Sequence, residues 1–105
     1  NYLMGVCVVG TGNKIEYLNP KGLEILKYKS AEDIKGKDYK DIFLLTDETK
    51  EAFWQRYFKK DPSLDALDIK LGDDSENKVQ AALTFVVGEK GIEVCGITFE
   101  AAPAS

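Results

Sequence analysis

Apolar and polar residues alternate along the last third of the chain, and this period of two predicts half-buried β-strands. The expected strands cover residues 64–71, about 77–87 and 92 to about 101. Turns are expected at residues 72–75 (GDDS) and in the hairpin loop 88–91 (GEKG). One face of these strands should carry Leu67, Ile69, Leu71, Val79, Ala81, Leu83, Phe85, Val87, Cys95, Ile97 and Phe99, and the other Gln80, Ala82, Thr84, Val86, Gly96, Thr98 and Glu100.

The start of the chain predicts a β-hairpin. Residues 5–9 (GVCVV) form a continuous apolar run rich in β-branched residues, which is typical of a strand buried for most of its length. A turn at residues 10–13 (GTGN) joins this run to a second strand at 14–19. Alternation assigns two pairs of residues to opposite faces of the first strand: Cys7 with Val9, and Val6 with Val8.

Between these strands the apolar residues take a helical spacing. Asn19 can cap a helix that begins at Pro20, because its side-chain carbonyl can accept from free amides and proline needs no bonded N–H there. Ser30, with Asp33 three residues later, predicts the start of a second short helix, which Gly36 can end in the left-handed conformation. The apolar residues of the first helix are Leu23, Ile25, Leu26 and Tyr28.

Residues 37–45 fit a further short helical turn, and residues 47 to about 60 fit the longest helix. Thr46 is the expected N-cap, with acidic residues in the first turns and lysines at the last, as the helix dipole favours. Asp61-Pro62 ends this helix. Its inner side should carry Ala52, Phe53, Tyr57 and Phe58, with Trp54 near the edge.

The order of elements is two strands, then helices, then three strands. Strands gathered at both chain ends and joined largely by hairpins favour an α+β fold with one antiparallel sheet and three or four short helices on one face. The chain has 105 residues, of which 44% are hydrophobic and 30% charged. This composition predicts one globular domain with a small core.

Composition also argues against several functions. The net charge of −4 without a basic cluster argues against nucleic-acid binding, and no apolar run approaches the length of a membrane span. The chain has no histidine, and its two cysteines lack the spacing of a metal site. Asp73, Asp74 and Glu76 lack the spacing of a calcium loop and fit a solvated turn. No nucleophile with a base and no phosphate-binding glycine loop is visible, so we expect no enzyme.

Four segments together resemble a PAS domain: GVCVV (5–9), IEYLNPKG (15–22), KYKSAEDIKGKDYKDIF (27–43) and ENKVQAALTFVVGEKGIEVCGITF (76–99). The resemblance implies a five-stranded antiparallel sheet in the order 2-1-5-4-3, which cups a ligand or an apolar core against the helices. PAS domains are mostly sensory or dimerising modules attached to histidine kinases, cyclases or transcription regulators. We therefore expect residues 1–105 to be one PAS-like domain, with its core at about 5–101, from a larger cytoplasmic signalling protein that also carries an effector domain.

Departures from the PAS pattern limit the cofactors that the resemblance implies. The Asn-Cys-Arg-Phe run of flavin-adduct members is absent, and so is the histidine that most haem-binding members use. We therefore expect neither haem nor a flavin adduct. The Asp-Ile-Thr run usual at the end of the last strand, which typically anchors the link to an effector, is replaced by ITFEAAP at residues 97–103.

The space between sheet and helices is the candidate binding site for a small molecule. Trp54 and Tyr57 would cover it from the long helix and, with Cys95, would supply its few polar contacts. The alternative is a filled core, because a domain of this size has little apolar material to spare. The pocket candidates are Cys7, Val9, Leu18, Trp54, Tyr57, Ile69, Leu83, Phe85, Cys95, Ile97 and Phe99.

The opposite face of the sheet is the candidate interface, because several apolar residues there should face away from the helices. A homodimer through this face or through the N-terminal segment suits the PAS resemblance; simple cover by residues 1–4 is the alternative. The resemblance also places Cys7 and Cys95 on one face of adjacent strands, as a redox switch or as two small buried hydrophobes. The interface candidates are Val6, Val8, Thr84, Val86, Val94 and Thr98.

Overall fold

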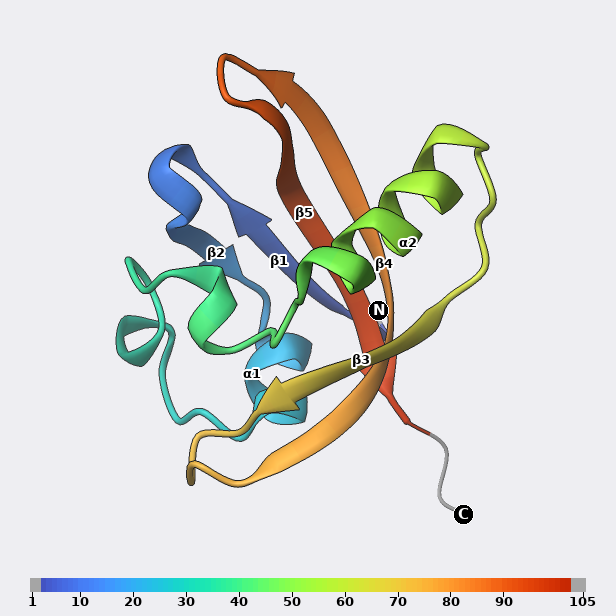
Figure 1. Cartoon of the computed structure of the whole chain (residues 1–105). Coiled ribbons are helices and arrows are strands. Elements are labelled where there is room, and N and C mark those ends of the chain that lie inside the picture. The colour runs from blue at the N-terminus through green and yellow to red at the C-terminus, as the bar shows by residue number, and fades with distance from the viewer. Residues whose placement is uncertain (1–2, 103–105) are drawn as a thin grey trace.

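The computed structural model describes residues 3–102 and shows a five-stranded sheet in the order β2-β1-β5-β4-β3 (Figure 1). Every neighbouring pair of strands is antiparallel, which confirms the expected topology. The first and last strands are neighbours at the centre of the sheet, where Cys7 lies opposite Ile97. The main elements are β1 (Gly5–Val9), β2 (Ile15–Leu18), α1 (Pro20–Leu26), α2 (Asp47–Phe58), β3 (Asp65–Lys70), β4 (Glu76–Gly88) and β5 (Gly91–Ala101).

The described residues form two α-helices, fewer than the expected three or four helices. The segments at Ala31–Asp33 and Tyr39–Asp41 are single 3-10 turns. Ser30 caps the first of these turns: its hydroxyl accepts a hydrogen bond from the backbone N–H of Glu32, two residues ahead. The backbone N–H of Gly36 then donates to the carbonyl of Ile15 in β2, and the N–H of Ile15 donates to the carbonyl of Lys37, so the helical segment does not continue.

Asn19 joins α1 to β1. Its Oδ1 accepts from the backbone N–H of Gly22, as the expected N-cap, and also from the N–H of Val6, each at 2.8 Å. Its Nδ2 donates to the carbonyl of Met4 at 3.1 Å. Among residues 3–102, Asn19 is the one polar residue classed as buried, so its side chain replaces water for three backbone groups.

Two glycines let α1 approach β1 closely. A Cβ placed on Gly5 would lie 2.5 Å from the ring of Phe99 and 2.9 Å from the Cα of Gly22. A Cβ on Gly22 would lie 2.6 Å from Leu18 Cδ1. The close approach of helix and strand therefore requires both positions to lack a side chain.

One apolar core lies between the inner face of the sheet and the helical segments. Phe43 and Phe99 meet edge to face at its centre, with ring centroids 5.3 Å apart. Most inner-face residues expected from alternation are buried there. From the strands the core contains Cys7, Val9, Ile15, Leu18, Leu67, Ile69, Val79, Ala81, Leu83, Phe85, Val94, Ile97 and Phe99, and from the rest of the chain Leu26, Ile34, Tyr39, Ile42, Phe43, Phe53 and Leu71.

Besides Cys95, which is described below, three expected inner positions are wrong. Ala52 is exposed and Phe58 is 68% exposed, because α2 meets the sheet along a narrow line on which only Phe53 is buried. Val87 is also exposed, since β4 continues beyond the part of the sheet that the helices cover (Figure 1).

A β-bulge in β5 reverses the expected positions of Val94 and Cys95. Thr84 pairs with Gly96, but the next residue, Phe85, pairs with Val94, so Cys95 is the extra residue. Val94 is consequently buried, and the Sγ of Cys95 lies 3.5 Å from the Oγ1 of Thr84, which is exposed on the outer face. One inserted residue moves the side chains on either side of it to opposite faces, because strand side chains alternate with a period of two.

Candidate functional site

The aromatic side chains of α2 cover the part of the inner sheet face around Phe85. Trp54 meets Phe85 of β4 edge to face, with ring centroids 5.5 Å apart, and Tyr57 lies 5.6 Å from the same ring. Trp54 is partly buried and Tyr57 is exposed, so the two rings form the boundary between core and solvent. Both rings therefore lie against the inner sheet face, and their role in covering a ligand site stays a prediction.

Helix α2 is attached to the sheet by few side chains. Thr46 caps it by accepting from the N–H of Thr49 at 3.1 Å, and Phe53 is its one buried residue. A groove of about 280 Å³ runs along one side of the helix, between Tyr57 and Leu83. A second groove of about 250 Å³ lies on the other side, between Trp54 and Ile92 of the β4–β5 hairpin. The helix therefore has open space on both flanks.

The pocket candidates divide into three groups. Eight of them are buried in the common core: Cys7, Val9, Leu18, Ile69, Leu83, Phe85, Ile97 and Phe99. Trp54 and Tyr57 lie at the edge of that core. Cys95 is not part of it, because the bulge turns its side chain toward Thr84 on the outer face. Phe53 and Ile92 line the two grooves but were not among the pocket candidates, although Phe53 was expected on the inner side of the helix. The sequence does not reveal how α2 sits against the hairpin.

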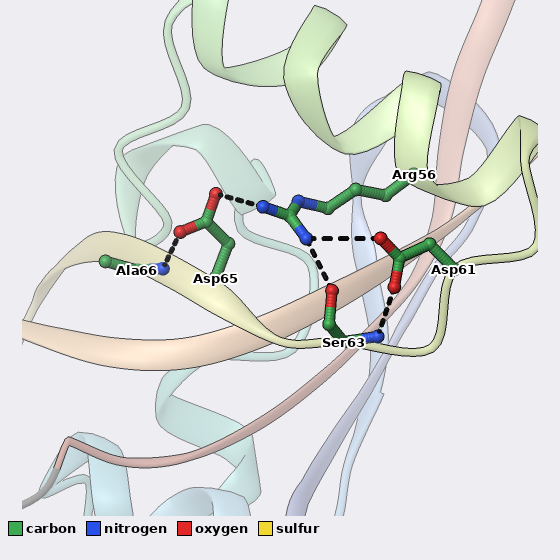
Figure 2. A network of polar contacts seen from close by, with 5 residues as sticks. All are labelled: Arg56, Asp61, Ser63, Asp65 and Ala66. Carbon is green, nitrogen blue, oxygen red and sulfur yellow. Dashed lines mark hydrogen bonds and ion pairs between the residues drawn. The ribbon is translucent and has the colours of Figure 1, made fainter.

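A polar network fixes the connection from α2 to β3 (Figure 2). The guanidinium of Arg56 lies 3.2 Å from Asp65 and 3.6 Å from Asp61, and it also donates to the hydroxyl of Ser63. Hydrogen bonds from Ser63, helped by the nearby Arg56, lower the pKa of Asp61. All of these groups are partly solvated, so the network sets the path of the chain more than it adds to stability.

The two cysteines lie on opposite sides of the sheet, so the expectation that they share a face is wrong. Both are free thiols. Burial raises the pKa of Cys7 to about 12, which keeps its thiol protonated and unreactive. Cys7 packs opposite Ile97 as a small apolar side chain, whereas Cys95 is partly exposed on the other face. This placement does not bring the two sulfurs together.

The outer sheet face carries most of the expected interface residues. Val8, Thr84 and Val86 are exposed there, whereas Val6 and Thr98 are partly buried. Val94 does not belong to this face. Tyr17 was not expected on it, but it lies opposite Val8, because a register shift in the β1–β2 pairing turns its ring outward. Tyr17 and Val8 are therefore exposed side by side on β2 and β1, and Val86 is exposed on β4, which β5 separates from β1.

Within residues 3–102, no group of His, Cys, Asp and Glu side chains could hold a metal ion. None of the helices in this part of the chain is long and apolar enough to cross a membrane.

Comparison with solved structures finds the same architecture at low sequence identity. A PAS domain from a two-component sensor histidine kinase is 16% identical, with a TM-score of 0.61, over 93% of this chain and 85% of that one. The PAS domain of nitrogen regulation protein NR(II) from Vibrio parahaemolyticus is 13% identical, with a TM-score of 0.64, over 97% and 92%. A chain of the E. coli DhaR(N)-DhaL complex is 12% identical, with a TM-score of 0.61, over 97% and 33%. No family model and no curated protein matches the chain.

Proposed function

We propose that this chain, which has the PAS fold, is a sensory or regulatory domain of a larger signalling protein and acts without catalysing a reaction. The sensor part of the proposal is that a small molecule binds between α2 and the inner sheet face, next to Phe85. The attached effector domain would then respond to the altered position of α2 or of the sheet. Such a response requires the ligand to favour one of two arrangements of the domain.

The attachment of α2 is the observation that supports this proposal. Phe53 is the one buried side chain of the helix, and the rings of Trp54 and Tyr57 rest on Phe85 at the boundary with solvent. A helix held by so little buried area can shift at small cost compared with the strands beneath it. An apolar ligand that inserts beside Phe85 would bury these partly exposed rings and so gain affinity.

Native mass spectrometry of the purified domain tests for a retained small molecule. Fluorescence provides a second readout, because Trp54 is the single tryptophan of the chain and lies at the proposed site. A ligand present at 100 times its dissociation constant should stabilise the domain by about 2.7 kcal/mol. Phe85→Leu should weaken this effect, whereas Phe43→Leu, in the core beside Phe99, should lower stability without weakening binding. Absence of any retained mass, with no stabilisation across a chemically diverse set of small molecules, would refute the sensor proposal.

A ligand-free dimerisation or docking module is the second candidate function. The supporting observation is that three apolar or aromatic side chains, those of Val8, Tyr17 and Val86, are exposed on the outer sheet face. The expected contribution of the N-terminal segment falls partly on residues 1–2, which lie outside the described residues. Sedimentation tests this function: Val8→Lys should dissociate an outer-face dimer, and Val87→Lys, which charges a valine away from that face, should not.

A further inference from the structure

Strand β4 is longer than β3, which pairs with it on one side. β3 pairs with β4 from Lys70 opposite Glu76 to Asp65 opposite Ala81, and the pairing ends there. β5 pairs with the whole remaining length of β4 up to Gly88. Residues 82–88 therefore have a partner strand on one side and none of the described residues as a strand partner on the other (Figure 1).

The two ends of β4 show to which side the backbone N–H and C=O groups of residues 82–88 point. The N–H of Leu71 donates to the carbonyl of Ser75 at 2.7 Å, so by alternation the odd-numbered residues of β4 face β3. At the other end, Gly88 and Gly91 close a two-residue loop and thus bond to each other, which makes the even-numbered residues face β5. The two ends agree, and the N–H and C=O groups of residues 83, 85 and 87 point to the side without a strand partner. Val87 is exposed on this side, whereas Leu83 and Phe85 are buried.

The outer edge of β3 is covered, which makes the bare part of β4 a local feature. The N–H of Leu44 donates to the carbonyl of Asp68 at 2.9 Å, and the N–H of Lys70 donates to the carbonyl of Ile42 at 2.8 Å. Beyond the end of β3, no segment within residues 3–102 bonds to β4 in this way. Soluble proteins usually place charges or proline on an exposed edge strand to prevent pairing with other chains. Residues 79–87 (VQAALTFVV) contain neither.

Apolar side chains gather beside the bare edge. Val87 is 74% exposed and Val86 is 51% exposed, and the rings of Tyr57 and Phe58 on α2 are also exposed. The groove between Tyr57 and Leu83 is also lined by Ala82 and Thr84 of this part of β4 and by Pro62 of the α2–β3 connection. The Arg56 network holds this connection in place (Figure 2), so the groove and the edge are available together.

We propose that a second copy of this chain pairs with residues 83–87 of β4 as an antiparallel strand. A twofold axis close to Val86 would place Phe85 of each copy opposite Val87 of the other, so that outward N–H and C=O groups of both chains bond to each other. The β4–β5 hairpin of each copy would then enter the mouth of the partner's groove. This brings the acidic Glu89 of the hairpin toward Lys60, which lines the groove at the end of α2, a complementary pairing of charges.

Residues 83–87 of β4 are also better suited to pairing with the same segment of a second copy than to pairing with a charged strand. Two identical strands without charges do not repel each other, and the apolar rings of the two α2 helices lie on the same side of the joined sheet. The proposal concerns the edge of the sheet and is independent of the outer-face dimer considered above, because Val86 points to the outer face and Val87 to the helix side.

Hydrogen exchange of the intact chain at two concentrations tests the pairing. The amides of Phe85 and Val87 should exchange fast in dilute solution and at least tenfold more slowly at several hundred micromolar, whereas those of Thr84 and Val86, which face β5, should stay slow at both. Sedimentation velocity should show a dimer at the higher concentration. Val87→Pro removes only the outward N–H and should abolish both effects.

Two further variants keep the test decisive if Val87→Pro folds poorly. Val87→Lys should give a folded monomer with fast exchange at Phe85, and Val86→Lys, its neighbour on the other face, should leave the dimer intact. A monomer at all concentrations would overturn the proposal. So would a dimer that survives Val87→Lys, or one in which the amides of Phe85 and Val87 remain unprotected.

Discussion

Replacing Asn19 by alanine should destabilise the domain more than any other single polar truncation of the described chain. The side chain holds three backbone groups from two elements, the N–H groups of Val6 and Gly22 and the carbonyl of Met4. Loss of a helix N-cap costs about 1 kcal/mol. Leaving the buried N–H of Val6 without a partner costs about 1–3 kcal/mol more. The expected decrease in the free energy of unfolding is therefore about 2–4 kcal/mol, a large part of the total for a small domain.

Urea denaturation followed by circular dichroism measures this change, with Trp54 fluorescence as a second probe of the same transition. The midpoint should fall while the slope of free energy against urea stays constant, because the surface exposed on unfolding is nearly the same. The melting temperature should fall by about 10–20 °C. Asn77→Ala is the matched control, since its amide is exposed and bonds only to the adjacent N–H of Lys78. The free energy of unfolding of Asn77→Ala should stay within about 0.5 kcal/mol of that of the unaltered protein.

A loss below about 1 kcal/mol for Asn19→Ala, similar to the control, would refute the reasoning, because a cap alone accounts for that much. It would mean that water reaches the N–H of Val6 once the side chain is removed. The link between α1 and β1 would then rest on apolar packing rather than on this amide.

Three further predictions concern packing and titration. Gly22→Ala should cost about 1–3 kcal/mol in thermal unfolding, because its methyl group would overlap the side chain of Leu18; a neutral result would mean that the Leu18 side chain can move aside. Phe53→Ala should cost about 3–5 kcal/mol, whereas Phe58→Ala, on the exposed side of α2, should be almost neutral; equal losses would contradict the orientation of the helix. The free energy of unfolding should fall as the pH rises from about 9 toward 12. Burial raises the pKa of Cys7 in the folded protein to about 12 from its ordinary 9.0, so the thiol of the unfolded chain loses its proton first. Cys7→Ala should flatten this decline, and an unchanged slope would contradict the raised pKa of Cys7.

Local patterns in the sequence are sufficient for the strands, the caps and the class of fold. Alternation predicted the last three strands, because each has one buried face and the side-chain period in a strand is two. The continuous apolar run at residues 5–9 and the turn after it predicted the first two. Asn19-Pro20 and Thr46 marked the starts of both helices, since capping depends on residues within one turn. Each of these signals acts over a few residues, so no knowledge of distant contacts was needed.

Local sequence patterns did not predict the bulge at Cys95. The position of an extra residue depends on how β5 satisfies β1 and β4 at the same time, and nothing in the local pattern of Val94, Cys95 and Gly96 marks it. It decided which residue enters the core, which cysteine is accessible and which members of the expected pocket and interface were wrong. A shift of one residue is sufficient for all of this, because it reverses the faces.

The sequence by itself determined which segments become strands and helices and which strand faces are apolar, because these follow from the period of the side chains along the chain. Only the tertiary structure decided how far β3 extends along β4, how narrowly α2 rests on Phe85 and which backbone edge stays open. Those features depend on the lengths of elements that are distant in sequence and meet only in the folded domain, and the proposed sites depend on them.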